Sequence, residues 1–191
     1  MRNVLIIGAS GNIARRVTHM LIERKYIRLT LFLRNRRRLG NNDLSGCKIV
    51  EGNALNYDQL RDVVVGQDIV YINLAGDLEA MAKNIVQAMK ETDVRRVILV
   101  SSIGIYDEPL RPVLKPYRAA ADVIENAGLD YTVLRPTWFT DVDEVDYEIT
   151  HKGQPEKGSV ISQKSLASFI VRIIENPEQF IGESLGINKP N

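Results

Sequence analysis

The segment at residues 4–14, VLIIGASGNIA, constrains the fold of this chain more than any other. Four consecutive branched apolar residues lead directly into a turn that carries Gly8 and Gly11. Apolar residues then recur at the three- and four-residue spacing of one helix face, at Ile13, Val17, Met20 and Leu21. This order predicts a buried parallel strand, a tight turn and the beginning of a helix.

The predicted turn has the properties of a phosphate site. A helix that begins there offers free backbone N–H groups and the positive end of its dipole. Gly8 permits the turn, Gly11 lets a pyrophosphate approach the backbone, and the small Ala14 lets the helix pack close to the strand. The spacing G-x-x-G-x-x-A differs from the general fingerprint G-x-G-x-x-G, and the alternative is an ordinary turn that binds nothing. The position between a strand and a helix favours a dinucleotide site.

Composition narrows the class of protein. A length of 191 residues predicts a single domain that spans residues 1–191. The 25 basic and 24 acidic residues leave a net charge of +1, which gives no global electrostatic case for nucleic acid or a membrane surface. Cys47 is the one cysteine, which excludes an internal disulfide and a thiolate metal cluster. No signal peptide is expected and no apolar run reaches the roughly 18 residues of a membrane span, so we expect a cytoplasmic protein.

Strand and helix patterns alternate along the rest of the chain. Strands are predicted at residues 28–33, 48–50, 68–74, 95–100, 130–134 and 184–187. Helices are predicted at residues 56–65, 79–91, 116–127 (ended by Gly128) and 163–175. Repeated strand–helix–strand units predict an α/β fold, a single doubly wound parallel sheet (Rossmann fold) with helices on both faces. Ligands of such sheets bind at the carboxyl ends of the strands.

The end of the second strand indicates which nucleotide is bound. An Asp or Glu about 20 residues past the glycines would bond the ribose 2′-hydroxyl of NAD. The sequence there is LRNRRR, residues 33–38, with no acid. Arg34 in this place predicts a bidentate partner for the 2′-phosphate of NADP, with Arg36, Arg37 and Arg38 as helpers. The alternatives are a solvated basic loop or a nucleic-acid patch, and NADP is favoured over NAD.

Further strand ends follow an order that resembles a known family. The third predicted strand leads into EGNA at residues 51–54, the fourth into LAG at 74–76, the fifth into VSSIG at 100–104, and the sixth lies within GLDYTVLRP at 128–136. With G-x-x-G-x-x-A, this order resembles the atypical short-chain dehydrogenase/reductase superfamily. The similarity is to its NAD(P)H-binding subgroup of NmrA-like and biliverdin reductase B/flavin reductase-like proteins. It covers essentially the whole chain, and GLDYTVLRP is its most specific part.

The resemblance implies a role for individual residues. It assigns the pyrophosphate to Gly8, Ser10, Gly11, Asn12 and Ile13. It places Arg34 at the 2′-phosphate, Asn53 and Ala54 beside the adenine, Ala75 and Gly76 along the ribose, Ser101 and Ser102 near the nicotinamide, and Pro136 near its carboxamide. Taken singly, Asn53 is equally well a turn residue and Ala75-Gly76 equally well a simple strand end. Their joint order along one sheet edge favours the cofactor roles.

The acid–base pair of the catalytic members of this superfamily is incomplete. Those members use a Ser or Thr at this strand end with Tyr-x-x-x-Lys, in which the lysine lowers the pKa of the tyrosine. Ser102 is in place and Tyr117 follows, but Ala121 stands where lysine is expected. An unassisted tyrosine keeps a pKa of about 10 and is a poor acid–base group at neutral pH. We therefore predict a structural role for Tyr117. Tyr106 lacks a lysine four residues on as well, and Ser102 remains the candidate catalytic residue.

This departure favours particular chemistry. Alcohol–ketone interconversion and sugar-nucleotide epimerisation need the missing pair. Hydride transfer to a flavin, quinone or tetrapyrrole needs chiefly positioning, because the acceptor delocalises charge and takes its proton from water. Trp138 and Phe139 are either stacking residues for such a ring or core residues. The first hypothesis is an NADPH-dependent oxidoreductase with a planar acceptor, and the second is a non-catalytic NADP(H)-sensing regulator with a protein partner.

The remaining polar residues give weaker signals. The acidic segment at residues 141–148 invites a metal interpretation, but it lacks the glycine and terminal Glu spacing of a calcium loop. A solvated loop near the substrate is expected there, and no metal site is predicted. His19 and His151 have no recognisable nucleophile or metal partner. Cys47 is expected to be a small core residue.

Overall fold

A computed structural model describes residues 1–40 and 44–190 of the protein. Its strands are β1 (Arg2–Ile7), β2 (Ile27–Leu33), β3 (Cys47–Glu51), β4 (Ile69–Ile72), β5 (Arg96–Val100), β6 (Asp130–Pro136), β7 (Trp138–Thr140), β8 (Glu148–His151), β9 (Val160–Ser162) and β10 (Glu183–Asn188). Its α-helices are α1 (Asn12–Leu21), α2 (Tyr57–Val64), α3 (Leu78–Glu91), α4 (Lys115–Glu125) and α5 (Gln163–Glu175). Short 3₁₀ helices lie at Arg36–Leu39 and Pro112–Leu114.

The main sheet is eight-stranded in the order β3-β2-β1-β4-β5-β6-β10-β8. Neighbouring strands from β3 to β10 pair in parallel, and the strand order reverses between β1 and β4. The predicted doubly wound fold is thus confirmed, and the reversal is the point at which such sheets bind ligands. One edge strand, β8, adds to this parallel sheet in the antiparallel direction, beside β10.

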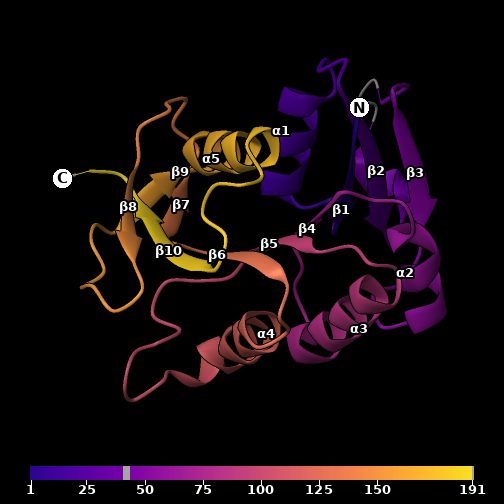
Figure 1. The fold of residues 1–191 in the computed structure, drawn as a ribbon. Coiled ribbons are helices and arrows are strands. Elements are labelled where there is room, and N and C mark those ends of the chain that lie inside the picture. The colour runs from indigo at the N-terminus through magenta and orange to yellow at the C-terminus, as the bar shows by residue number, and fades with distance from the viewer. Residues whose placement is uncertain (41–43, 191) are drawn as a thin grey trace.

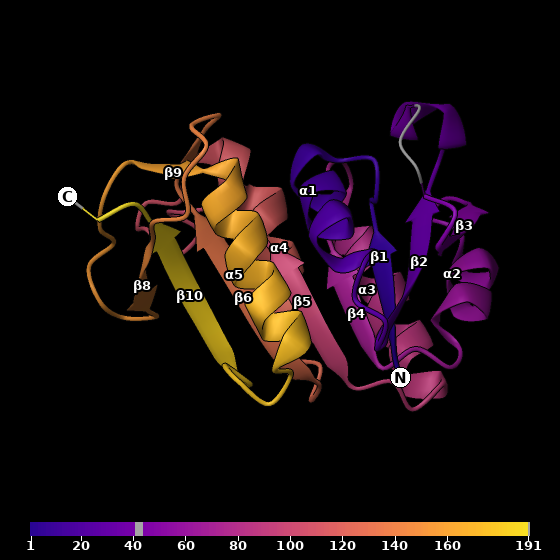
Figure 2. The ribbon, with the colours of Figure 1, turned by 90° about the horizontal axis from the view of Figure 1, so that it is seen from above.

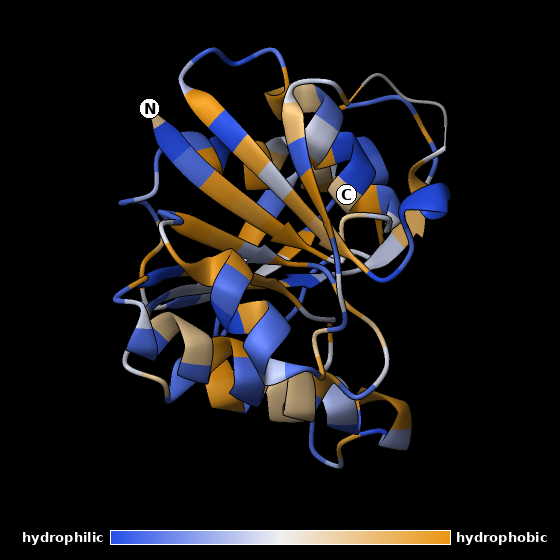
Figure 3. Ribbon diagram, turned by 90° about the vertical axis from the view of Figure 1, so that its right-hand side faces the viewer, coloured by the Kyte–Doolittle hydropathy of each residue, from blue (hydrophilic) through white to orange (hydrophobic). Residues whose placement is uncertain are grey.

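The helices cover both faces of the sheet (Figures 1 and 2). In Figure 1, α1 and α5 lie above the sheet, and α2, α3 and α4 lie below it. Each face has its own core of buried apolar side chains, and the apolar residues of β1 alternate between the two, with Val4 and Ile6 on the α1 side and Leu5 and Ile7 on the other. Figure 3 shows the strands as largely hydrophobic ribbons between helices of mixed character. This burial explains why the strands read as continuous apolar runs.

Most predicted elements match the structure to within two residues. Helix α5 has the predicted bounds, and its Ser162 cap accepts a bond from the backbone N–H of Ser165. Helix α4 ends at Glu125, so Gly128, with a φ of +71°, lies beyond its Asn126 cap. Strands β7, β8 and β9 were not predicted, because they are three or four residues long and too short for a periodic signal. No α-helix in the described ranges is long and apolar enough to cross a membrane.

Candidate functional site

The turn after β1 is built around Asn73, the first residue past β4. Gly8 has a φ of +83°, a backbone conformation that residues other than glycine rarely adopt. A Cβ added at Gly8 would lie 2.0 Å from the backbone oxygen of Asn73, and one added at Gly11 would lie 2.4 Å from the Asn73 side-chain nitrogen. The two glycines therefore let the turn pack directly against Asn73, which the sequence analysis did not single out.

Helix α1 begins immediately after this turn. Gly11 is its N-terminal cap and provides no side-chain hydrogen bond, and the first turn contains no acidic residue. Ala14 is fully buried against the sheet, as its small size predicted. The uncapped N–H groups and the dipole of α1 thus remain available to an anion at Gly11.

A cleft of about 250 Å³ lies at the carboxyl ends of β1, β2, β3 and β4. It coincides with the reversal of strand order, between the glycine turn and the residues that follow β2, β3 and β4. Eight of the predicted cofactor residues line it: Gly8, Ser10, Gly11, Arg34, Asn53, Ala54, Ala75 and Gly76. Along the strand order β3-β2-β1-β4, the residues to which the resemblance gives adenine, 2′-phosphate, pyrophosphate and ribose roles follow one another, so the residues present fit a bound dinucleotide.

Arginines form the end of the cleft beside β2. Arg34 and Arg38 line the cleft, whereas the other two arginines of the run, Arg36 and Arg37, do not. Within residues 1–40 and 44–190, neither Arg34 nor Arg38 is in an ion pair with a carboxylate. Glu51 accepts a bond from the backbone N–H of Arg36 at 2.6 Å. Two uncompensated guanidinium groups thus face a space that suits an anionic group.

Five predicted site residues lie outside the lining of this cleft. Ile13 is buried in the core, and the Asn12 side chain accepts a bond from Arg15. Ser101 and Ser102 follow β5, and Pro136 ends β6, the next strands along the same edge. The Ser102 hydroxyl donates to the carbonyl oxygen of its neighbour Ile103 at 3.2 Å.

The position four residues after Tyr117 on α4 is Ala121 and not lysine. Ala121, one turn later, is fully buried in the core, and Tyr117 packs against the same core. The Ser101 hydroxyl donates to the carbonyl oxygen of Tyr117 at 3.4 Å rather than to its phenol. Arg118 forms an ion pair with Asp122, with 2.8 Å between Arg118 Nε and Asp122 Oδ1. These contacts are those of packing residues.

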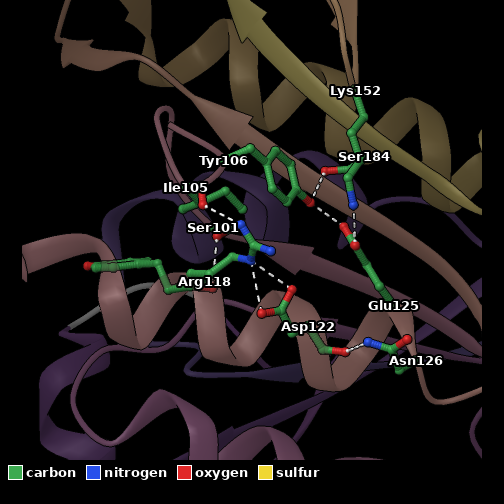
Figure 4. Close-up of polar contacts among 10 residues, drawn as sticks. Ser101, Ile105, Tyr106, Arg118, Asp122, Glu125, Asn126, Lys152 and Ser184 are labelled. Atoms are coloured by element: carbon green, nitrogen blue, oxygen red, sulfur yellow. Dashed lines mark hydrogen bonds and ion pairs between the residues drawn. The ribbon is translucent and has the colours of Figure 1, made fainter. Parts of the chain in front are cut away.

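Tyr106 lies in a polar network under β6 and β10 (Figure 4). Its hydroxyl is bonded to Glu125 and lies 2.9 Å from the Ser184 hydroxyl. Lys152 lies 4.2 Å from the centre of the ring, so a lysine is near this tyrosine in space. Burial, and next the bond to Glu125, raise the pKa of Tyr106 far above its ordinary value. A phenol so perturbed stays protonated at neutral pH and does not serve as a general base.

Lysine side chains pair with carboxylates of the acidic segment. Asp143 pairs with Lys164 at 2.7 Å and Glu144 with Lys189 at 2.7 Å. In the part of the chain that the structure describes, no group of three His, Cys, Asp or Glu side chains is placed to hold a metal ion. Cys47 is partly buried at the start of β3, and burial raises its thiol pKa to about 11.

Comparison with known proteins places this geometry in a family. The family model described as NAD(P)H-binding matches residues 8–177. A Rossmann-fold NAD(P)-binding family protein from Shigella flexneri is 46% identical, with a TM-score of 0.92 over 100% of this chain and 95% of that one. A short-chain dehydrogenase/reductase from Veillonella parvula, solved in complex with NADP, is 25% identical, with a TM-score of 0.90 and the same coverage.

A plant reductase matches a shorter part of the chain. Cinnamoyl-CoA reductase 1 of Petunia hybrida is 32% identical over an alignment of 125 residues, which covers 56% of this chain and 38% of the plant protein. The predicted nicotinamide dinucleotide cofactor and the resemblance to the atypical short-chain dehydrogenases/reductases are confirmed by the family match and the NADP-bound neighbour. The chain belongs to the NAD(P)H-binding family of Rossmann-fold proteins.

Proposed function

We propose that the protein is an NADPH-dependent oxidoreductase that passes a hydride to a planar acceptor of the flavin or quinone type without a Tyr–Lys acid–base pair. The observation that carries the proposal is the cleft itself, where a glycine turn and helix start lie at one side and Arg34 and Arg38 at the other. The glycine turn and the helix start attract a pyrophosphate. The two arginines suit the 2′-phosphate that distinguishes NADP from NAD.

The proposed chemistry uses few protein groups. Bound NADPH supplies a hydride, and the acceptor takes its proton from water. Ser102 follows β5, and its neighbour Ile103 donates a backbone bond to the Pro136 carbonyl oxygen at 3.0 Å. The loop that carries Ser102 thus lies beside the end of β6, and the Ser102 hydroxyl is our candidate for a hydrogen bond to the acceptor. Neither Tyr106 nor Tyr117 has the surroundings of a proton donor for a ketone.

The direct experiment is a spectrophotometric assay of NADPH oxidation with a panel of quinones, riboflavin and FMN. Turnover with at least one planar acceptor, and none with simple ketones, is the expected result. Tight NADPH binding with no turnover by any acceptor would refute the oxidoreductase proposal. That outcome would favour the second candidate, an NADP(H)-sensing regulator, for which the alanine at position 121 in place of lysine is the supporting observation.

Arg34→Ala is expected to weaken NADP⁺ binding selectively. Loss of a hydrogen bond to a charged group costs about 1.5–3 kcal/mol, so the dissociation constant should rise roughly 10- to 150-fold. NAD⁺ binding should change little, because NAD⁺ lacks the 2′-phosphate. Calorimetry measures both affinities. Arg37→Ala is the matched control, since Arg37 does not line the cleft, and an equal loss for NAD⁺ and NADP⁺ in Arg34→Ala would exclude the assigned role.

Tyr117→Phe is expected to keep its rate of NADPH oxidation to within about twofold, because the phenol does not take part in the reaction. General acid–base catalysis typically contributes about 10²–10⁴-fold, so the two cases are well separated. Steady-state kinetics with the best quinone of the panel measures the effect. A fall in kcat of about 100-fold or more, in a variant that binds NADP⁺ normally, would show that Tyr117 donates a proton after all.

A further inference from the structure

Large apolar side chains are exposed on the segment that follows β6. Trp138 is 73% exposed and Phe139 is 47% exposed, and Val142, Val145 and Val160 are exposed as well. We call these five residues the apolar rim. Trp138 lies directly opposite Val160 in the parallel pairing of β7 with β9, so these two side chains share one face. Trp138 and Val160 thus present a shared apolar surface to solvent, and an exposed apolar surface of this kind is typical of a binding site.

The apolar rim continues the edge of the sheet that holds the cofactor cleft. Thr137 alone separates Trp138 from the end of β6. The cleft lies at the ends of β1 to β4, and β5 and β6 are the next strands in the sheet. Figure 2 shows β9 and the start of α5 at the end of the sheet to which the β6 arrow points. Trp138 is thus two residues past Pro136, at the edge of the sheet where the hydride acceptor is expected.

The charges around the apolar rim disfavour an anion. The acidic segment at residues 141–148 carries five carboxylates, those of Asp141, Asp143, Glu144, Asp146 and Glu148. Four cations pair with them: Arg16 with Asp141 at 3.8 Å, Lys164 with Asp143 at 2.7 Å, Lys189 with Glu144 at 2.7 Å and Lys157 with Glu148 at 3.5 Å. Each of these cations already has a carboxylate partner, and one carboxylate is in excess. A phosphate, sulfonate or carboxylate on a ligand would meet net negative charge here.

We propose that the apolar rim binds an uncharged planar ring, stacked on Trp138, and that this ring is the hydride acceptor. The inference rests on the proposed function and narrows its substrate class to neutral quinones and unphosphorylated flavins. For a quinone, one hydride from the cofactor and one proton from water yield the hydroquinone and NADP⁺. An aromatic surface beside apolar side chains favours such a ring. The ring needs no charged group of its own to bind there.

Trp138 is the one tryptophan of the chain, so its fluorescence reports directly on the apolar rim. The experiment titrates NADP⁺-saturated protein with two matched pairs, menadione against menadione sulfonate and riboflavin against FMN. Free N-acetyltryptophanamide corrects for absorption of light by the ligands. Saturable quenching is expected, with the uncharged member of each pair binding at least about fivefold more tightly, because the anion meets the excess carboxylate. Equal or tighter binding of the anionic members would overturn the proposal.

Two variants test the two parts of the argument. Trp138→Ala should raise the KM for menadione about tenfold or more through lost stacking and burial, and Trp138→Phe should restore most of the affinity. Asp143→Asn should free Lys164 from its ion pair, so FMN should bind about two- to fivefold more tightly. The affinity for riboflavin should not change. Wild-type kinetics in Trp138→Ala would overturn the proposal.

The inference and the proposed function fail in different ways. Selective quenching without NADPH oxidation would refute the reaction but leave the uncharged-ring site standing. Quinone turnover without any quenching would leave the reaction standing and refute the site. A concentration-dependent blue shift of the Trp138 emission, with a dimer in size-exclusion chromatography, would show that a second copy covers the apolar rim, and this would also refute it.

Discussion

Replacing Gly8 with alanine is expected to lower the free energy of unfolding by about 2–5 kcal/mol, as the sum of a left-handed backbone penalty and overpacking. The added Cβ would lie 2.0 Å from the backbone oxygen of Asn73, so β4 and its following loop must shift. Because Asn73, Leu74 and Ala75 line the cleft, NADP⁺ binding should weaken as well. Urea unfolding and calorimetry measure the two effects.

Gly66→Ala is the matched control for this variant. Gly66 has a similar φ of +74°, but an added Cβ would meet no described heavy atom within 4 Å. It should cost only the backbone penalty of about 1–2 kcal/mol and leave NADP⁺ binding unchanged. If the two variants lost stability equally and bound NADP⁺ equally well, the close packing of the turn against Asn73 would be refuted.

Replacing Glu156 with alanine is expected to lower the free energy of unfolding by about 3–5 kcal/mol, because it leaves a buried charge without its partner. The side chain of Arg135 is only 3% exposed and forms an ion pair with Glu156 from the loop before β9. Burial lowers the pKa of Arg135 from its ordinary value, but it remains a cation at neutral pH. Its remaining bonds, to the carbonyl oxygens of Ser184 and Thr150, are long, at 3.3 and 3.4 Å.

Lys83→Ala is the comparison for an exposed ion pair. Lys83 and Glu79 are both well exposed on α3, and removal of such a pair costs about 0–1 kcal/mol. Urea unfolding of both variants tests the contrast. A loss in Glu156→Ala no larger than in Lys83→Ala would mean that water reaches Arg135. The free energy of unfolding of Glu156→Gln should lie between those of wild type and Glu156→Ala, because the amide oxygen still accepts a hydrogen bond.

The glycine turn and the doubly wound sheet could be predicted from the sequence because their signals are local. Gly8, Gly11 and Ala14 lie within one short segment, and four adjacent apolar residues identify β1. Arg34 could be placed at the cleft because it follows a recognisable strand at a known distance from the glycines. Asn73 could have been found in the same way, since it directly follows β4, but an asparagine at a strand end reads equally well as a turn residue.

The polar contacts under β6 and β10 could not be predicted, because they join residues far apart in the chain. Tyr106 reaches Ser184 across 78 positions, and Arg135 and Glu156 read as surface charges in the sequence. The sequence left two roles open for Trp138 and Phe139, stacking or core, because aromatic residues beside a strand are usually core, and the structure shows both side chains exposed. Within the described residues, β7 pairs with β9 alone, which is itself three residues long, and Trp138 is 73% exposed.

We infer that the cleft between the glycine turn and Arg34 holds NADP(H). Calorimetric titration of the wild-type protein with NADP⁺ and, separately, with NAD⁺ tests this assignment. We predict that NADP⁺ binds at least about tenfold more tightly than NAD⁺, since the 2′-phosphate adds a charge-assisted bond. Equal affinity for the two dinucleotides, or tighter binding of NAD⁺, would contradict the account.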